Sequence, residues 1–455
     1  MDKFIFLILV IAVILICFFL YISFFIPKEL EIKTNLESSP DWLIIKQEAD
    51  SGLAQTFLPL FEQIKEKFIL AKLSFLEINL SEMKVRVYKA GDMVNEVPVL
   101  KKGDPQNWGG TAAGLYEVKE KYVNSFSVVA EVYMPWTVRI YGKYYLHGEP
   151  YYPGGYPLIS SSSGGCVQLL NKNAKAIYQL TEIGMPIIVI DQEGDGYHYP
   201  KAELDSLSDV SAQSYLVADL NSGFVLADKK ANEILPIASL TKLMTSLVVT
   251  ENKDLKRWIE VEEKMLEAYG STKGLEAGKE FRIVELLYPL LIESSNDASE
   301  VLAGFLGREE TIQMMNEKAK AILMNNTKFT DPSGYNPANV STVQDLFYLG
   351  RYIFYNRPPI LEITKGKKVS SYGPIDFDIE NLWNKNVFVN DPTFAGGKTG
   401  FTKQANYTGL FIFKLKTLQE TERNIIIILL KSDNLESDAQ KIYQWLQKTY
   451  FTESS

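Results

Sequence analysis

The stretch Ser239-Leu240-Thr241-Lys242 begins a segment rich in Leu, Met and Val, which predicts a helix. Residues i and i+3 of a helix share one face, so the amine of Lys242 is expected beside the hydroxyl of Ser239. A serine hydroxyl needs a base to act as a nucleophile at neutral pH, and a desolvated lysine is such a base. Many helices contain this tetrapeptide pattern by chance, so the surrounding sequence decides what it means.

Two further short motifs follow in the same region. Ser294-Ser295-Asn296 is expected in a loop after the apolar helix 283–292, and Lys398-Thr399-Gly400 stands just before a predicted pair of strands. Thr399 and the strand backbone can bind the carboxylate and backbone of a peptide, while Gly400 allows close approach. We therefore expect the three segments to form one serine site.

The region that contains these motifs, residues 213–451, has strands at both ends and helices between them. The sequence predicts a hairpin at 215–227, helices over about 239–355, strands at 407–413 and 424–430, and a final amphipathic helix near 439–446. This order favours an α+β fold, in which an antiparallel sheet is closed by the two ends of the domain and a helical subdomain is inserted. We call residues 213–451 the serine domain.

In this order and with this wide spacing, the three motifs resemble the S-x-x-K, S-x-N and K-T-G set of the penicillin-recognising serine enzymes. The sequence is most similar to the D-alanyl-D-alanine carboxypeptidases of low molecular mass, over most of residues 214–451. Two further landmarks are Phe329–Tyr335 and Ser341–Asp345. The resemblance implies a penicillin-binding or β-lactamase-like fold. It also implies removal of the terminal D-Ala from peptidoglycan stem pentapeptides through an acyl-serine intermediate, with β-lactams as inhibitors.

The same resemblance implies a role for each motif residue. Ser239 would be the nucleophile, Lys242 its base, and Ser294 the proton relay to the leaving amine. Asn296 would hold the substrate amide, Lys398 and Thr399 would engage the terminal carboxylate, and Gly400 would border the substrate. The backbone N–H groups of Ser239 and Phe401 would form the oxyanion hole. Hydrolysis of β-lactams and D,D-endopeptidase action are alternatives that use the same motifs.

A second stretch, Ser161-Ser162-Ser163-Gly164-Gly165-Cys166-Val167-Gln168, ends a run of small residues in a cysteine. The other cysteine, Cys17, lies within an apolar segment at the N-terminus, so Cys166 has no plausible disulfide partner in the chain. An unpaired thiol is a liability in an oxidising compartment. Catalysis explains its presence better than packing does, although a buried inert thiol remains an alternative.

The surroundings of Cys166 supply what a nucleophilic thiol needs. Short β-branched and aromatic runs, separated by turn residues, predict a mainly β domain over residues 73–191, which we call the cysteine domain. His147 precedes Cys166 by 19 positions and is a candidate base. The backbone N–H groups of Gly164, Gly165 and Cys166 are unobstructed oxyanion donors. The helix expected over 171–180 would lower the pKa of the thiol through its dipole.

This arrangement resembles the L,D-transpeptidase catalytic domain, often called YkuD-like, over roughly residues 73–191. The similarity rests on Thr111–Tyr116, the His147-Gly148 pair and Ser163–Cys166. It implies that Cys166 attacks the bond between the third residue of a stem tetrapeptide and its D-Ala. His147 would be the base, and Gly148 and Gly165 would border the substrate.

The sequence departs from this family at Gly164, where a histidine is usual, and at Gln168, where Arg or Asn is common. One alternative is therefore a degenerate domain that only binds the wall. Several aromatic residues are candidates for a substrate cleft or for simple packing: Trp108, Trp136, Tyr144, Tyr145, Tyr151, Tyr152 and Tyr156.

The N-terminus carries the strongest targeting signal. Residues 4–26 form an uncharged apolar run of about 23 residues, long enough to span a bilayer as a helix, and no small-residue cleavage site follows it. We predict a signal anchor at 1–28, a helical stalk at 29–72 and a polar linker at 192–212. The expected protein is a single-pass membrane protein with extracytoplasmic catalytic domains.

Composition limits the remaining function classes. The net charge of −9 argues against nucleic acid as a partner, and two histidines supply a zinc site poorly. No cofactor or metal is expected. The resulting hypothesis is a multidomain, bifunctional wall enzyme. Its D,D-carboxypeptidase makes the tetrapeptide that its L,D-transpeptidase requires, and tethering raises the effective concentration of that intermediate.

Overall fold

The computed structural model describes residues 61–191, 194–199, 207, 209–267, 275–369, 375, 377–417 and 419–451. The predicted membrane segment at 1–28 and most of the predicted stalk lie outside these residues. Within the described part of the chain, no helix has both the length and the apolar character that crossing a membrane requires.

Two sheets form the cysteine domain. The first has the order β3-β2-β1-β9-β4 and the second the order β5-β6-β7-β8. Their bounds are β1 (Phe75–Asn79), β2 (Lys84–Lys89), β3 (Asp92–Pro98), β4 (Gly114–Glu117), β5 (Lys121–Ser127), β6 (Val132–Tyr141), β7 (Tyr144–His147), β8 (Val167–Gln168) and β9 (Pro186–Ile190). The helices are α3 (Phe61–Leu70) and α4 (Asn171–Leu180), with the short turn η1 (Pro105–Asn107). The helix predicted over 171–180 is confirmed by α4.

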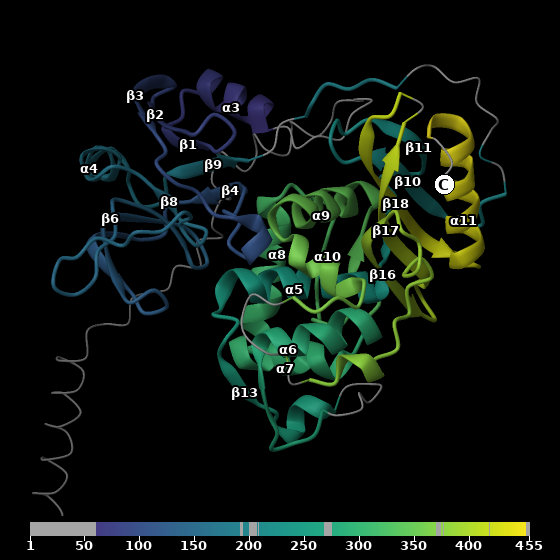
Figure 1. The fold of residues 1–455 in the computed structure, drawn as a ribbon. Helices are drawn as coiled ribbons and strands as arrows, with labels where there is room; N and C mark the ends of the chain where they lie inside the picture. The colour runs from purple at the N-terminus through teal and green to yellow at the C-terminus, as the bar shows by residue number, and fades with distance from the viewer. Residues whose placement is uncertain are drawn as a thin grey trace, which may run out of the picture. The chain divides into compact units, whose positions relative to one another are not determined.

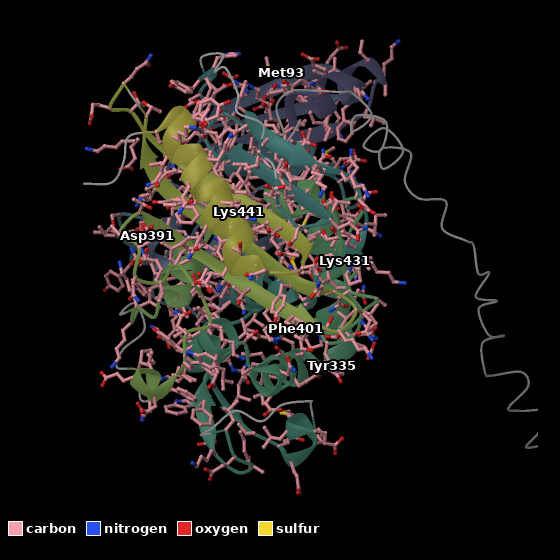
Figure 2. All side chains as sticks on the ribbon, turned by 90° about the vertical axis from the view of Figure 1, so that its right-hand side faces the viewer. Met93, Tyr335, Asp391, Phe401, Lys431 and Lys441 are labelled. Atoms are coloured by element: carbon pink, nitrogen blue, oxygen red, sulfur yellow. The ribbon has the colours of Figure 1, made fainter. Side chains whose placement is uncertain are left out.

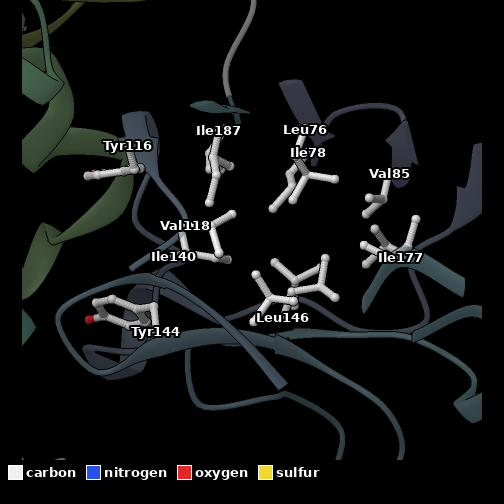
Figure 3. Packing of buried hydrophobic residues seen from close by; sticks show 14 of the residues in the cluster. Leu76, Ile78, Val85, Tyr116, Val118, Ile140, Tyr144, Leu146, Ile177 and Ile187 are labelled. Carbon is white, nitrogen blue, oxygen red and sulfur yellow. The ribbon is translucent and has the colours of Figure 1, made fainter. Parts of the chain in front are cut away.

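One apolar cluster lies between the two sheets. Leu76 and Ile78 of β1 meet Leu146 of β7 and Ile177 of α4 in this cluster (Figure 3). Because side chains alternate across a strand, each sheet contributes every second residue to this core. The packing fixes β7, and β7 carries His147.

A five-stranded antiparallel sheet forms the centre of the serine domain, in the order β11-β10-β18-β17-β16. Its strands are β10 (Ser214–Asp219), β11 (Val225–Lys229), β16 (Phe394–Thr402), β17 (Asn406–Lys416) and β18 (Glu422–Ser432). The pairing of β10 with β18 joins the two ends of the domain. This confirms the predicted closure of the sheet.

The two faces of this sheet are covered by different helices (Figure 1). Ile425 and Ile427 of β18 belong to the core that α11 (Leu435–Tyr450) covers. Ile426, between them, lies against Gly350 of α9 (Val343–Asn356), where an added Cβ would stand 2.5 Å from the isoleucine Cδ1. Alternate side chains of β18 therefore pack against α11 on one face of the sheet and against α9 on the other.

The inserted helical subdomain carries the serine motif at its start. Its helices are α5 (Thr241–Asn252), α6 (Ile283–Tyr288), α7 (Asn296–Leu306), α8 (Arg308–Ala321) and α10 (Pro358–Thr364). Short elements complete it: β12 (Leu235–Pro236), η2 (Ala238–Leu240), β13 (Trp258–Glu260), η3 (Glu263–Leu266), β14 (Glu280–Arg282), η4 (Pro289–Glu293), β15 (Val340–Ser341) and η6 (Ile379–Asn381).

The structure corrects the expected position of the third motif. Lys398-Thr399-Gly400 lies inside β16, not before the strand pair, and Thr399 pairs with Gly409 of β17. The segment is rich in glycine and lacks the alternating apolar pattern of a strand. Its extended form comes from backbone hydrogen bonds to β17 at the edge of the sheet.

Residues 195–199, one described part of the predicted linker, contact the serine domain. Tyr199 is buried and its hydroxyl donates to Asp219 of β10 at 2.8 Å. Arg423 of β18 forms ion pairs with both Asp195 and Asp219. The described residues near 195–199 are therefore docked on the serine domain through buried polar contacts, which polarity alone does not predict.

Candidate active sites

The serine nucleophile lies in the turn η2, directly before α5. Ala238, the residue before it, has a φ of 47°, an unfavourable conformation for a residue with a Cβ. This backbone presents Ser239 at the beginning of the helix, and the Nζ of Lys242 lies 3.0 Å from its Oγ. The predicted proximity of the hydroxyl and the amine is thus found in the structure.

Lys242 is completely buried, which shapes its chemistry. Its Nζ also donates to the side-chain oxygen of Asn296 at 2.8 Å and to the carbonyl of Ser333 at 2.6 Å. Burial lowers the pKa of Lys242 to about 7. A neutral amine with a free lone pair is therefore accessible near neutral pH, as a general base requires.

In the second motif, one serine caps a helix and the other lines the cavity. Ser295 caps α7, because its hydroxyl accepts from the N–H of Ala298 at 2.9 Å. Ser294 has a left-handed backbone with a φ of 65°. Its buried Oγ has no hydrogen-bond partner among the described residues, and it lines the cavity in front of Ser239. Ser294 and Asn296 thus lie on either side of the capping residue Ser295, and both line the cavity.

The third motif closes the opposite wall. A Cβ added at Gly400 would stand 2.7 Å from the backbone nitrogen of Ser239 and 2.7 Å from Thr408 Oγ1, so only glycine fits. Thr399 lines the cavity. Lys398 is buried and its Nζ donates to the carbonyl of Thr399 at 2.9 Å. Burial, with the charges of Lys242 and Lys385, holds the pKa of Lys398 well below its usual value.

The cavity has a volume of about 1030 Å³ and is open to solvent. Tyr335 and Phe401 lie at its rim on one face of the molecule (Figure 2), and Phe401 packs against Tyr407 with ring centroids 4.6 Å apart. Its other lining residues include Lys385, Lys403 and Glu436. The sequence analysis assigned no role to Lys385, Lys403 and Glu436, which come from the loop before β16, the turn after β16 and the first turn of α11.

The sequence analysis also missed the turn that holds Lys242. Asp331 accepts from the N–H groups of Ser333 and Gly334, both at 2.7 Å. A Cβ at Gly334 would stand 1.8 Å from the carbonyl oxygen of Ala238. The landmark Phe329–Tyr335 therefore serves to bring a carbonyl acceptor to Lys242 and to support the turn of the nucleophile.

In the cysteine domain, Cys166 stands one residue before β8. β8 runs parallel to β7 with His147 opposite Gln168 and Leu146 opposite Val167. Cys166 is therefore level with Tyr145, two positions from His147 along β7. Since side chains alternate, Cys166 and His147 point to the same face of the sheet. The register therefore places the two predicted residues on neighbouring segments, facing the same side of the sheet.

His147 is oriented by its own backbone neighbour. Its Nδ1 lies 2.6 Å from the carbonyl oxygen of Gly148. A carbonyl only accepts, so Nδ1 carries the proton and Nε2 is the basic nitrogen. Burial lowers the pKa of His147 to about 4, so the ring is neutral at physiological pH.

The thiol differs from expectation. Burial raises the pKa of Cys166 to about 11. α4 begins at Asn171 as predicted, but the pKa of the thiol is raised, so the lowering that we expected from the helix dipole is wrong. At physiological pH the Cys166 thiol and the His147 imidazole are both neutral. Activation therefore requires proton transfer to His147 during attack rather than a preformed thiolate.

The two glycines before Cys166 have different reasons to be there. A Cβ at Gly165 would stand 2.2 Å from the ring of Tyr144, so a side chain is excluded. A Cβ at Gly164 would meet nothing within 4 Å, although its φ is 65°. The space that the family's usual histidine would occupy is therefore open. Gly148 is confined by Asn171 Oδ1, 2.3 Å from an added Cβ.

The aromatic residues separate into two groups. Trp108 and Tyr144 are buried in the domain, so they are packing residues and not parts of a cleft. Tyr152 and Tyr156 are exposed on the segment between His147 and Cys166. Tyr151 stacks on Tyr133 with centroids 5.4 Å apart.

Comparison with known proteins matches each of the two domains to a known family. Residues 201–432, just over half of the chain, match the family model described as D-alanyl-D-alanine carboxypeptidase. The chain belongs to the D-alanyl-D-alanine carboxypeptidase family. It is therefore a serine peptidase of that class. Residues 74–189 match the L,D-transpeptidase catalytic domain, so the chain joins the two families that the motifs indicated.

Several relatives of this carboxypeptidase family are similar in sequence. A D-alanyl-D-alanine carboxypeptidase of Mycobacterium tuberculosis is 33% identical over 207 residues, covering 44% of this chain and 70% of that protein. A D-alanyl-D-alanine endopeptidase of Haemophilus influenzae is 35% identical over 214 residues, covering 45% and 70%. A solved carboxypeptidase structure from Mycobacterium tuberculosis has 26% identity and a TM-score of 0.45, covering 56% of this chain and 94% of that one.

Proposed function

We propose that this protein is a membrane-anchored, bifunctional peptidoglycan enzyme. Its serine domain removes the terminal D-Ala from stem pentapeptides, and its cysteine domain uses the resulting tetrapeptide. The observation that carries the first activity is the buried Nζ of Lys242, 3.0 Å from Ser239 Oγ, with a pKa of about 7. The sequence of residues 1–28 supports anchoring in a membrane, with both domains outside the cytoplasm.

At the serine site, neutral Lys242 takes the proton of the Ser239 hydroxyl as the oxygen attacks the carbonyl of the penultimate D-Ala. The backbone N–H groups of Ser239 and Phe401 stabilise the oxyanion. Ser294 passes a proton to the nitrogen of the leaving D-Ala. Water then hydrolyses the acyl-serine ester and restores the hydroxyl.

Substrate binding is supported by the open edge of β16. The sheet order ends at this strand, so an extended peptide can pair with its backbone beside Ser239. Thr399 offers a hydroxyl in the cavity that can donate to a carboxylate, and the buried amine of Lys398 donates to the carbonyl of Thr399 behind it. The same acyl transfer would open a β-lactam ring, which makes these compounds expected inhibitors.

At the cysteine site, Nε2 of His147 takes the thiol proton while the sulfur attacks the carbonyl of the third stem residue. D-Ala leaves as an amine with the proton returned from His147, and a thioester remains. An amine of a second stem, or water, then releases the acyl group and regenerates the thiol. The tetrapeptide used here is the product of the serine site.

A non-catalytic cysteine domain is a second candidate. The raised thiol pKa and the glycine at 164 favour it, because both weaken activation of the sulfur. In that case the domain holds peptidoglycan while Ser239 alone works.

The test uses the full chain in detergent with a pentapeptide muropeptide, followed by mass spectrometry. The unsubstituted protein should form tetrapeptide, then a cross-link or tripeptide. Ser239→Ala should leave the pentapeptide intact. Cys166→Ala should stop at the tetrapeptide, and supplied tetrapeptide should remain unchanged. Identical products from the unsubstituted chain and Cys166→Ala would reject the second activity and favour the binding role.

A further inference from the structure

Three charged side chains of the serine domain are completely buried in one cluster: Glu251 at the end of α5, Lys318 of α8 and Arg357 after α9. Lys318 Nζ and Arg357 Nη2 each lie 2.8 Å from a carboxylate oxygen of Glu251. Two cations and one anion in a dry interior require further polar partners, because an uncompensated buried charge is costly.

The cysteine domain supplies several of those partners. Arg357 Nη2 donates to the hydroxyl of Tyr144 at 2.6 Å, and its Nη1 donates to the carbonyl of Gly110 at 2.7 Å. Lys318 donates to the hydroxyl of Tyr116 at 2.9 Å. In Figure 3 the hydroxyls of Tyr116 and Tyr144 point away from the aliphatic side chains of the apolar core of the cysteine domain. The charges of one domain are thus stabilised by groups of the other.

Both contacts of Arg357 lead to the loop of Cys166. The ring of Tyr144 stands 2.2 Å from the position of a Cβ on Gly165, so the loop rests directly on this ring. The carbonyl of Gly109, next to Gly110, is 3.1 Å from the same position. One guanidinium therefore contacts the Tyr144 side chain and the backbone next to Gly109, and Gly165 packs against the Tyr144 ring and the Gly109 carbonyl.

A second contact between the two domains lies at the end of α5. Lys143 donates from its backbone N–H to the carbonyl of Glu251 at 3.3 Å and from its Nζ to the carbonyl of Lys253 at 3.0 Å. These bonds satisfy carbonyls at the end of α5, where a cation is also favourable. The charge of Lys143 lowers the pKa of Cys166 against the larger effect of burial.

We propose that the serine domain forms part of the cysteine site, with Arg357 as a positioning residue for Gly165-Cys166 through Tyr144 and Gly110. The cysteine domain is then not an independent module, because the setting of its nucleophile depends on a side chain of the neighbouring domain. This inference goes beyond the proposed activities and holds whether or not Cys166 is catalytic.

The test measures the thiol itself. Full-length protein with Cys17→Ser is alkylated with iodoacetamide between pH 6 and 10, and Cys166 is followed by intact mass. Tyr144→Phe removes only the hydroxyl that Arg357 contacts, and Arg357→Lys keeps the charge but loses the paired contacts. The control Tyr352→Phe removes a hydroxyl bonded to Glu251 and Lys318, and Arg351→Lys alters a buried arginine bonded to Leu220.

We expect both test variants to change the alkylation rate at pH 8 by about fivefold and to shift the pH midpoint of the reaction, since the lost bonds are each worth about 1 kcal/mol. Both controls should stay within about twofold. Acylation of Ser239 by a fluorescent penicillin should be unchanged in all four. An unchanged pH profile in both test variants would overturn the proposal. So would equal shifts in tests and controls, because that result means general loosening.

Discussion

At the scale of single residues, the serine site depends on a lysine that burial keeps close to neutral. The pKa of Lys242 is lowered to about 7, so the fraction of free amine rises as the pH increases through that value. Acylation of Ser239 by a penicillin should therefore accelerate about tenfold per pH unit below 7 and level off above it. Stopped-flow measurement of the pH profile tests this.

The control is Lys242→Met, which should lower the acylation rate by about 10³ while the protein stays folded. A profile in the unsubstituted protein that is flat from pH 5 to 9 would contradict the role of Lys242 as the base.

His147 makes stability depend on pH. Its folded pKa of about 4 lies below the usual 6.5, so the protein loses stability as the pH falls from 6.5 toward 4 and the buried ring must become charged. The contribution is about 3 kcal/mol at pH 4. Chemical denaturation of the unsubstituted protein and of His147→Asn should show this difference.

The two glycines of the cysteine loop offer a matched pair of substitutions. Gly165→Ala places a methyl group 2.2 Å from the ring of Tyr144 and should lower the free energy of unfolding by about 3 kcal/mol. Gly164→Ala meets open space and carries only the cost of its positive φ, about 1 kcal/mol. Thermal unfolding distinguishes them. Equal costs would mean that Tyr144 does not support the loop.

At the scale of elements, β16 works by lying close to the nucleophile. Gly400→Ala should block the oxyanion site, because the new Cβ would stand 2.7 Å from the N–H of Ser239. We expect the rate of penicillin acylation to fall by at least about 10². Gly366→Ala, at a glycine with open space, is the control and should acylate normally. Normal acylation in Gly400→Ala would show that the strand does not border the oxyanion.

Element α5 has a chemical role at each end. Its first residues follow Ser239 and carry Lys242, while its last residues meet Lys143 of the cysteine domain. The richness of the segment in Leu, Met and Val predicts the helix. It does not predict that the two ends serve two sites, because the partners at the far end are distant in the sequence.

At the scale of the whole molecule, the buried cluster around Glu251 joins the two domains. Glu251→Gln removes the only negative charge facing Lys318 and Arg357 among the groups of this cluster. The free energy of unfolding should fall by about 3 kcal/mol. Glu309→Gln breaks an exposed pair with Arg308 and should cost less than about 0.5 kcal/mol. Guanidinium unfolding compares them, and similar costs would contradict a structural role for the cluster.

The sequence by itself determined the motifs, the order of the domains and the two candidate nucleophiles, because periodicity, turn residues and motif spacing are local properties of the chain. Ser239 with Lys242 needed only the geometry of one helix. The placement of Thr399 in a strand required β17, because a glycine-rich segment becomes extended only through pairing. The pKa of Cys166 was mispredicted for a related reason. It depends on the burial of the thiol, and burial is decided by residues that are distant in the sequence.

Only the tertiary structure decided how the sites are completed. The carbonyl of Ser333, the open space at Gly164 and the link from Arg357 to Tyr144 all join residues far apart in the chain. Such contacts do not appear in the hydrophobic periodicity of a single sequence, because each of the two residues fits the pattern of its own segment. The two families and the motifs of both candidate sites could therefore be predicted from the sequence, while the contacts that support those motifs are formed only by packing.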